Sequence, residues 1–268
     1  MVRRKEANSV FESINARWKN LRRNHFSHTG WGRNLKSLQR KYAGQRCFII
    51  GNGPSLRVED LEKLKNEYTF AFNRIYYIFE ETSWRPTFYC IQDAKIAAVS
   101  AEEIRKHITT PYLFAPINLK WYEGEDLDSE YFFCPKLAGE SVPEFSEDVS
   151  RFVGVGNTVA YTAMQLAVYM GFSEIYLLGV DHSFQTYQDK DGNIVTDPNA
   201  KDYFTDKYNQ NKDALFVPRL DLSTLSYMAA QAYAETHTVT IYNATRGGKL
   251  EVFPRVEFDS LFEKKDKE

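Results

Sequence analysis

Short hydrophobic runs, rich in β-branched and aromatic residues, recur along the chain from about residue 45. They predict strands at 46–50, 68–72, 86–91, 111–115, 174–179 and 239–242. Stretches with apolar residues at helical spacing lie between most of these runs, at 58–66, 94–107, 157–170 and 221–236. Strands that alternate with helices are typical of a mostly parallel sheet covered on both faces, so we expect a Rossmann-like α/β fold.

Two stretches, 116–150 and 182–219, lack this regular pattern. The second follows the fifth predicted strand and has a centre rich in Asp, Lys, Asn and Gly. Long irregular segments within compact domains are usually functional. We therefore expect one α/β domain over residues 42–268, in which residues of about 182–219 form a lid over the ligand site.

Polar residues follow the predicted strands. In open α/β sheets, ligands bind beyond the carboxyl ends of the strands, so these residues mark an expected polar crevice. Turns are polar in any protein, and this explains many of these residues, but Gln, His and Arg are less usual in turns. The candidates are Gly51, Asn52, Gly53, Asn73, Gln92, Asp93, Asn118, Asp181, His182, Asn243, Thr245 and Arg246.

The loop GNGPS at 51–55, which ends in Ser55, joins the first predicted strand to a helix. It is neither GxGxxG nor a P-loop, and Asn73 stands where an NAD site has an acidic residue, so NAD is disfavoured. Its glycines allow a ligand to approach the backbone closely. A second loop, which contains Gly156, Asn157 and Thr158, also precedes a helix. Two such helix starts at one crevice predict a nucleotide with its phosphate between them.

The formal charge of −2 is unevenly distributed along the chain. Residues 1–46 contain 12 Lys or Arg and 2 Glu, a balance of +10, and the remaining residues carry −12. We expect residues 1–41 to form a basic amphipathic helical arm that docks on an anionic membrane surface or on a second subunit. No nucleic acid is expected, because no basic patch continues into the acidic body. The apolar positions of the arm are Val10, Phe11, Ile14, Trp18 and Leu21.

No stretch has the composition of a secretion signal or a membrane span. The three cysteines are far apart and lack the spacing of a zinc site. We expect a cytoplasmic protein, peripheral at the inner face of the cell membrane if the arm binds lipid, without disulfides or a structural metal.

Several motifs occur in the order typical of one family. They are CFIIGNGPSL, FAFNRIYYIF, RPTFYCIQD, GNTVAYTAMQLAVYMGFSEIYLLGVDHSF and IYNATRGGKLEVFPRVEFDSLF. Over roughly residues 42–264 the chain resembles the MptE-like domain family, named after an archaeal 6-hydroxymethylpterin pyrophosphokinase. Many bacterial members look like glycosyltransferases of surface polysaccharide or flagellin glycosylation. A weaker resemblance extends to bacterial sialyltransferases that use a CMP-activated donor.

The resemblance implies roles for particular residues. Gly51, Asn52 and Gly53 match the loop of the sialyltransferases that contacts the nucleotide, and Asn73 and Thr158 match further donor-site positions. In that family, tyrosines of the lid bind the donor phosphate without a divalent metal. By this resemblance the phosphate ligands here are Tyr187, the nearest candidate, then Tyr203 and Tyr208.

In the sialyltransferases the general base is a histidine of the lid, but residues 184–219 of this chain contain none. We expect His182 to take the proton of the acceptor, with Asp181 orienting its imidazole or acting as the base itself. Arg246 is a candidate for binding the leaving phosphate. Asp189 and Asp191 form a DxD sequence within a turn, so a divalent metal is possible but not expected.

The favoured hypothesis is a glycosyltransferase that transfers a sugar, from a CMP-linked nonulosonate donor in the most specific version, to a hydroxyl of a glycan or lipid-linked acceptor. One alternative is a Mg²⁺-dependent pyrophosphokinase of a pterin-like alcohol, although Gln92 and Asp93 offer few carboxylates for Mg²⁺. Another alternative is a non-catalytic scaffold that binds a nucleotide sugar.

Overall fold

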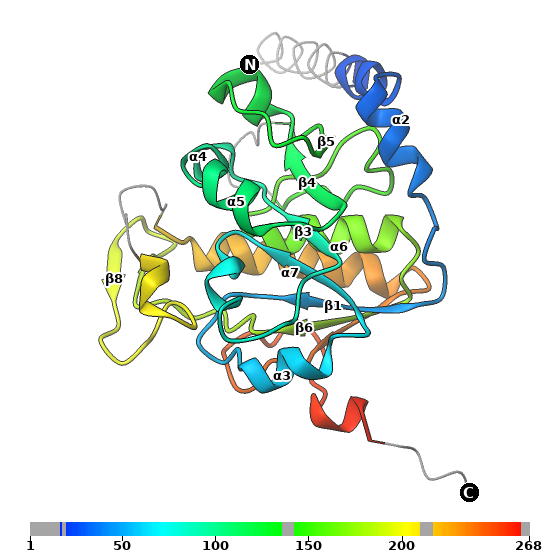
Figure 1. The fold of residues 1–268 in the computed structure, drawn as a ribbon. Coiled ribbons are helices and arrows are strands. Elements are labelled where there is room, and N and C mark those ends of the chain that lie inside the picture. The colour runs from blue at the N-terminus through cyan, green and yellow to red at the C-terminus, as the bar shows by residue number, and fades with distance from the viewer. Residues whose placement is uncertain (1–16, 18–19, 136–141, 210–216, 264–268) are drawn as a thin grey trace, which may run out of the picture.

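The computed structural model describes residues 17, 20–135, 142–209 and 217–263. Its main feature is a parallel sheet with strand order β5-β4-β3-β2-β1-β6-β9 (Figure 1). The strands are β1 (Arg46–Ile50), β2 (Tyr68–Phe72), β3 (Phe88–Cys90), β4 (Tyr112–Pro116), β5 (Glu130–Phe132), β6 (Glu174–Leu178) and β9 (Thr240–Asn243). The predicted Rossmann-like α/β fold is confirmed.

The order of the strands reverses between β1 and β6. The chain adds β2 to β5 on one side of β1, then returns to place β6 on its other side, in register from Arg46 opposite Glu174 to Ile50 opposite Leu178. The chain therefore continues from β1 to β2 on one side and from β6 to β9 on the other. Such a switch point at the carboxyl end of the strands is where open α/β sheets bind ligands.

Helices cover both faces of the sheet. In Figure 1, α6 (Val159–Tyr169) and α7 (Leu220–Glu235) lie together on one face, and α3 (Val58–Lys63) lies on the other. The remaining helices are α2 (Gly30–Ser37), α4 (Ala94–Val99), α5 (Ala101–His107) and the short turns η1 (Ile75–Ile78), η2 (Leu119–Glu123), η3 (Asp206–Asn209) and η5 (Asp259–Leu261). No described helix is both long enough and apolar enough to cross a membrane.

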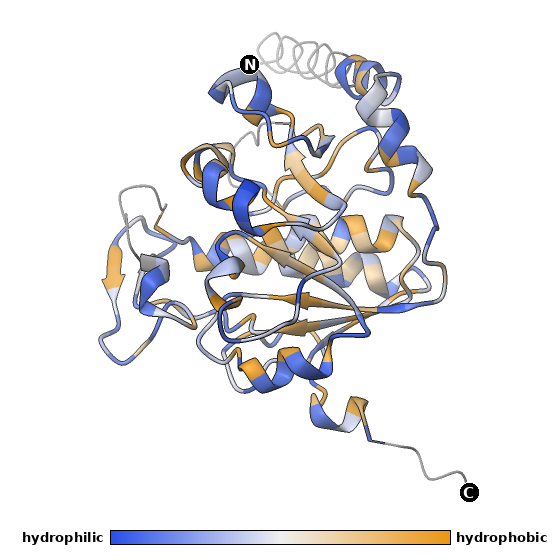
Figure 2. Ribbon diagram, viewed as in Figure 1, coloured by the Kyte–Doolittle hydropathy of each residue, from blue (hydrophilic) through white to orange (hydrophobic). Residues whose placement is uncertain are grey.

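The core consists of the strands and the helix faces that pack on them. Figure 2 shows the central strands as almost uniformly hydrophobic, as expected when both faces of a parallel sheet are covered. Cys47, Cys90 and Cys134 are free and buried in this core. Burial raises the pKa of all three thiols, which makes them unreactive.

The structure refines several predicted boundaries. The helix predicted at 94–107 is divided at Ser100 into α4 and α5. Strand β5 was not predicted, because it lies within the stretch 116–150, which lacks a regular pattern. The segment 182–219 contains an antiparallel hairpin of β7 (Thr186–Gln188) and β8 (Ile194–Thr196) within its irregular chain.

Most of the predicted arm lies outside the described residues, including Val10, Phe11, Ile14 and Trp18. Its described end packs against the edge of the sheet at β5. There Phe26 is buried, Trp31 packs edge-on against Tyr131, and the Arg23 guanidinium pairs with Glu144. Leu21 is 59% exposed. Docking of the arm on a membrane or a second subunit, and the domain boundary at residue 41, stay predictions.

Candidate functional site

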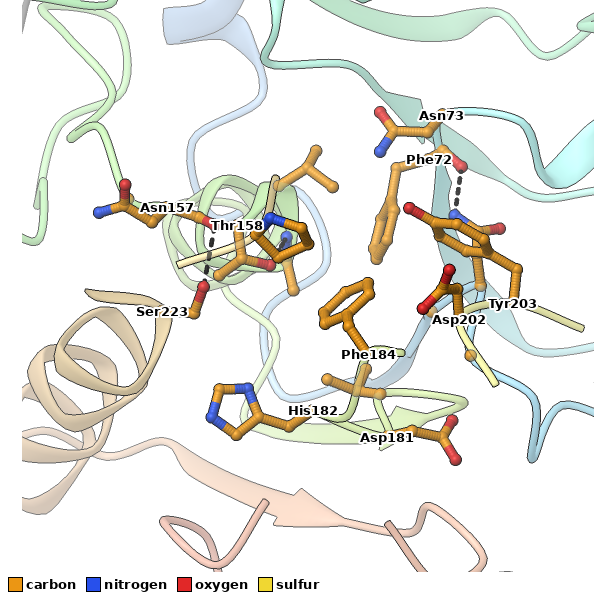
Figure 3. A pocket seen from close by; sticks show the side chains of 18 of the residues that line it. Phe72, Asn73, Asn157, Thr158, Asp181, His182, Phe184, Asp202, Tyr203 and Ser223 are labelled. Carbon is orange, nitrogen blue, oxygen red and sulfur yellow. Dashed lines mark hydrogen bonds between the residues drawn. The ribbon is translucent and has the colours of Figure 1, made fainter. Parts of the chain in front are cut away.

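A cavity of about 450 Å³ lies at the carboxyl end of the sheet, around the switch point. Its wall combines the loops after β1, β2, β3 and β6, the start of α6, the lid segment and the start of α7 (Figure 3). The predicted site residues that line it are Gly51, Asn52, Gly53, Asn73, Gln92, Asp93, Gly156, Asn157, Thr158, Asp181, His182 and Tyr203. Those outside its lining are Ser55, Tyr187, Asn243, Thr245 and Arg246.

The glycines of the first loop allow it to pack against the loop after β6. A Cβ atom on Gly51 would lie 2.2 Å from the carbonyl oxygen of Gly179, and one on Gly53 would lie 1.9 Å from Oδ2 of Asp181. Neither distance is compatible with a side chain. The two loops thus form one continuous wall of the cavity, and the glycines are required by this wall with or without a ligand.

Asn52 holds the first loop to the second strand and keeps one polar atom unused. Its Nδ2 donates to the carbonyl oxygen of Phe72 at 3.0 Å (Figure 3). Its Oδ1 is buried and accepts no hydrogen bond from a described residue. Because an unsatisfied buried acceptor is costly, a ligand that donates to Oδ1 would gain a hydrogen bond that the protein alone lacks.

Asn73 adopts a left-handed backbone conformation at the end of β2, with φ of 52°. Its carbonyl oxygen accepts a 2.7 Å hydrogen bond from the hydroxyl of the buried Tyr89. Asparagine tolerates this conformation better than most residues. The bond fixes the backbone at Asn73, whose side chain lies at the cavity in Figure 3.

The polar residues after β3 maintain the architecture of the site. The Gln92 amide donates to the carbonyl oxygen of Gly156 at 2.8 Å and accepts from the hydroxyl of Thr162 at 2.6 Å. It therefore ties β3 to the loop before α6. The Asp93 carboxylate accepts from two backbone N–H groups at the start of α4, at 2.9 and 3.1 Å, and acts as its N-cap.

The N-terminus of α6 faces the cavity. Thr158 caps this 11-residue helix. Two serines of α7 hold the loop before the helix: the Ser226 hydroxyl accepts a hydrogen bond from the backbone N–H of Asn157, and the Ser223 hydroxyl donates one to the Asn157 carbonyl. A Cβ atom on Gly156 would lie 2.7 Å from Tyr161, so this glycine is also required by packing. The positive end of the helix dipole makes this part of the wall suited to an anion.

Asp181 is bound to Ser55 and makes no hydrogen bond to His182. Its Oδ2 accepts from the Ser55 hydroxyl at 2.7 Å, and the residue is 7% exposed. Burial raises the pKa of this carboxyl, against the lowering effect of the Ser55 hydrogen bonds. Figure 3 shows the side chains of Asp181 and His182 pointing to opposite sides of their loop. The expectation that Asp181 orients the imidazole is therefore wrong.

His182 is held by α7 instead. Its Nε2 lies 2.8 Å from Oγ1 of Thr224, and its ring packs edge-on against Tyr227 at 5.5 Å between centroids. The backbone at His182 is left-handed, with φ of 52°. Burial lowers the pKa of the imidazole, which favours the neutral form. Nothing in the sequence of the helix marked Thr224 as its partner.

The lid segment closes one side of the cavity with stacked aromatic rings. Tyr203 stacks on Tyr208 at 3.7 Å between ring centroids, and Phe184 points into the cavity. The backbone N–H of Phe204 donates to the carbonyl oxygen of Asn52 at 3.0 Å. The buried Arg74 is a contact that the sequence did not reveal. Its Nη1 donates to the Tyr208 carbonyl at 2.7 Å, which ties the lid to the end of β2.

The hairpin of the lid lies outside the lining of the cavity. Tyr187 is on β7, so the structure does not bring it together with the cavity residues. The Asp189 carboxylate accepts hydrogen bonds from the backbone of Asp191 and Asn193 and shapes the turn between β7 and β8. Among the described residues, no group of three or more His, Cys, Asp or Glu side chains is placed to hold a metal ion.

Arg246 faces a second, smaller cavity of about 260 Å³, which Asn243 and Thr245 also line. Its guanidinium pairs with the buried Asp60 at 2.9 Å and with Asp259. Asn243 and Thr245 bond to neighbouring backbone groups, such as the Leu250 carbonyl and the Val180 N–H. These three residues support the loop after β9 and are not part of the lining of the larger cavity.

The fold is similar to that of two solved structures. The MAf glycosyltransferase from Magnetospirillum magneticum AMB-1 has a TM-score of 0.54 and 18% identity, over 84% of this chain and 36% of that one. The present chain thus spans about a third of its length. The sialyltransferase CstII from Campylobacter jejuni, in complex with the substrate analogue CMP-3FNeuAc, has a TM-score of 0.47 and 14% identity, over 79% of this chain and 86% of that one.

No match is found among curated proteins. The family model of the 6-hydroxymethylpterin diphosphokinase MptE-like proteins matches residues 19–187. This match begins within the predicted arm and ends in the lid, and it includes the loops after β1, β2, β3 and β6 that form most of the cavity wall. Because it extends over more than half of the chain, the protein belongs to the MptE-like family.

Proposed function

We propose that the protein transfers a sugar from a nucleotide-activated donor to a hydroxyl acceptor. One observation carries this proposal: a single cavity combines a helix N-terminus, suited to a phosphate, with a half-buried imidazole whose Nδ1 makes no hydrogen bond to a described residue. The proposed transfer uses both features, because a phosphate leaves as a hydroxyl loses its proton.

The donor is proposed to lie between the loop at 51–53 and the start of α6. Its phosphate would be near Thr158, where the helix dipole favours the charge that develops on the leaving group. The base and ribose would reach the first loop, where Asn52 Oδ1 offers an unused acceptor. A CMP-linked nonulosonate is the specific donor we favour, and the acceptor is a glycan or lipid-linked hydroxyl.

The acceptor hydroxyl is proposed to lose its proton to His182. The new bond forms between the acceptor oxygen and the anomeric carbon of the sugar, and the bond from that carbon to the phosphate oxygen breaks. A neutral imidazole is the form that can accept a proton, and burial favours it here. Tyr203, rather than Tyr187, is the lid tyrosine at the cavity. Arg246 has no part in this mechanism.

The name of the family favours a second candidate, a diphosphokinase that transfers pyrophosphate from ATP. Such chemistry is supported by Mg²⁺ and by carboxylates that hold it. The carboxylates at the cavity belong to Asp93, Asp181 and Asp202, and each accepts hydrogen bonds from protein groups. This engagement makes the glycosyltransferase the better supported of the two.

Thermal shift with CMP, UDP, GDP and ATP, each with Mg²⁺ and with EDTA, distinguishes the candidates. A nucleotide at 100 times its Kd stabilises a protein by about 2.7 kcal/mol, which for a chain of this size raises Tm by about 5 °C. We expect CMP to stabilise the protein equally with EDTA. Stabilisation by ATP alone, and only with Mg²⁺, would overturn the proposal in favour of the diphosphokinase.

Transfer from a CMP-linked donor, followed by release of CMP, then tests catalysis. We expect His182→Gln to retain the thermal shift with CMP and to lose transfer by about 10²-fold or more. His237→Gln is the matched control, because His237 lies at the far end of α7 and outside the cavity. A protein that binds CMP but neither transfers nor hydrolyses any donor would be the non-catalytic scaffold.

A further inference from the structure

The contact between His182 and α7 determines which ring nitrogen can act as a base. Nε2 lies 2.8 Å from Oγ1 of Thr224, a distance at which one of the two atoms must donate a hydrogen to the other. A neutral imidazole has one nitrogen that donates and one that accepts. The direction of this hydrogen bond therefore decides the tautomer.

The second contact of Thr224 settles that direction. Its Oγ1 also lies 2.8 Å from the carbonyl oxygen of Leu220, one helical turn earlier. Two oxygen atoms at this distance need a hydrogen between them, and a carbonyl has none to give. The single hydroxyl proton of Thr224 thus points to Leu220, and toward His182 this hydroxyl can only accept.

We infer that Thr224 is a positioning residue, which holds neutral His182 with its proton on Nε2 and leaves the lone pair of Nδ1 directed to the cavity as the base. Nδ1 makes no hydrogen bond with a described residue, and Figure 3 shows it on the side of the ring that faces Thr158. This inference deepens the proposed function and rests on it for the role of the base.

The surroundings of the ring support this assignment. Among the described residues, its hydrogen bond is to the hydroxyl of Thr224 and its ring contact is with Tyr227, and neither group is charged. The nearest carboxylate along the chain, that of Asp181, is turned to Ser55. Without a carboxylate to fix the imidazole, the hydroxyl of Thr224 performs the orienting role that a third group performs in catalytic triads.

The proposed step exchanges bonds at the acceptor oxygen and at the anomeric carbon. The acceptor O–H bond breaks, its proton forms a new N–H bond at Nδ1, and its electron pair forms the bond to the anomeric carbon. The bond from that carbon to the phosphate breaks, and the nucleotide leaves with the electron pair. The imidazolium that results keeps its Nε2–H hydrogen bond to Thr224, so the ring does not turn during the step.

Long-range ¹⁵N–¹H NMR of the full chain labelled with ¹⁵N-histidine reads the tautomer directly. The chain has five histidines, and His182→Gln identifies the signals of His182 by their loss. Without ligand at neutral pH, we expect a protonated Nε2 and an unprotonated Nδ1. Thr224→Val should produce a mixture of tautomers, and Thr224→Ser should preserve the wild-type pattern.

Thr236→Val is the matched control, because Thr236 ends the same helix and its hydroxyl contacts His237 outside the cavity. It should leave the signals of His182 unchanged. A proton on Nδ1 of the wild type, or a Thr224→Val variant that melts cooperatively with an unchanged tautomer, would overturn the inference.

Kinetics then separate this inference from the proposed function. In transfer from a CMP-linked donor, Thr224→Val should lower kcat by about 10-fold to 100-fold with little change in the KM of the donor, and Thr224→Ser should restore it. Unchanged kcat in an active enzyme would overturn the positioning role. If the expected tautomer is found but no donor is used, the proposed function fails while the assignment of the hydrogen bond holds.

Discussion

Gly53→Ala should break the junction between the loops after β1 and β6, and the structure gives the size of the effect. The new Cβ would lie 1.9 Å from Oδ2 of Asp181 and 2.7 Å from the carbonyl oxygen of Gly179. Because a contact of 1.9 Å is impossible, the Asp181 carboxylate must leave its place beside Ser55. The Gly179 carbonyl belongs to the backbone and cannot turn away, so its contact with the new Cβ stays strained. This displacement would lose the 2.7 Å hydrogen bond between them.

Two costs add to the expected loss of stability. Overpacking of a tight site costs about 1–3 kcal/mol, and a lost hydrogen bond to a charged group costs about 1.5–3 kcal/mol. The two ranges sum to about 2.5–6 kcal/mol, and we expect the lower part of that range, about 3 kcal/mol, because water can solvate the displaced carboxylate. With a urea m-value of about 3 kcal/mol/M, the midpoint of unfolding should fall by about 1 M.

Gly30→Ala provides the matched control. Gly30 begins α2, and a Cβ atom there would meet no atom within 4 Å. Since alanine favours helices over glycine, this variant should be as stable as the wild type or more stable by up to about 1 kcal/mol. If Gly53→Ala lost less than about 1 kcal/mol with an unchanged m-value, the close packing of the two loops would be refuted.

Three further predictions concern other residues. Arg246→Ala should lower the free energy of unfolding by about 2 kcal/mol, because it leaves the buried Asp60 carboxylate without its ion-pair partner. Calorimetry should nevertheless give an unchanged affinity for CMP. A loss of affinity would show that Arg246 belongs to the donor site. Burial lowers the pKa of His182 below its usual 6.5, so its contribution to stability is complete above pH 6.5 and is lost as pH falls through the folded pKa. As pH falls, Tm should therefore decline less steeply in His182→Gln than in the wild type. Parallel curves of Tm against pH would contradict this prediction. Arg74→Ala removes the hydrogen bond to the Tyr208 carbonyl that holds the lid, and it should weaken CMP binding by about tenfold. An equal affinity in the variant and the wild type would argue against the lid as part of the site.

The sequence predicted the fold because its signal is repeated and local. In β1 and β6 every residue after the first is buried, and several such runs between helices are typical of a covered parallel sheet. The same reasoning located the ligand site at the strand ends, since parallel strands end at one edge. Strand β5 escaped prediction because its pairing with β4, rather than its composition, makes it a strand.

The sequence could not assign roles to residues within the site. Gln92 and Asp93 were chosen as polar strand ends, and both support neighbouring elements through hydrogen bonds. Arg246 also follows a strand, but the loop after β9 carries it to Asp60 of α3, outside the lining of the larger cavity. Position along the chain determines which edge a residue reaches, and only the path of each loop decides what its side chain meets.

Asp181 and His182 illustrate this limit most clearly. The sequence determined that an acidic residue and a histidine follow β6 at the switch point, and adjacency suggested that they act as a pair. The tertiary structure decided otherwise, because the left-handed backbone at His182 directs its ring to Thr224 while the carboxylate of Asp181 meets Ser55. The partners lie 42 and 126 residues away along the chain, and hydrogen-bond direction over such separations depends on packing that no local pattern records.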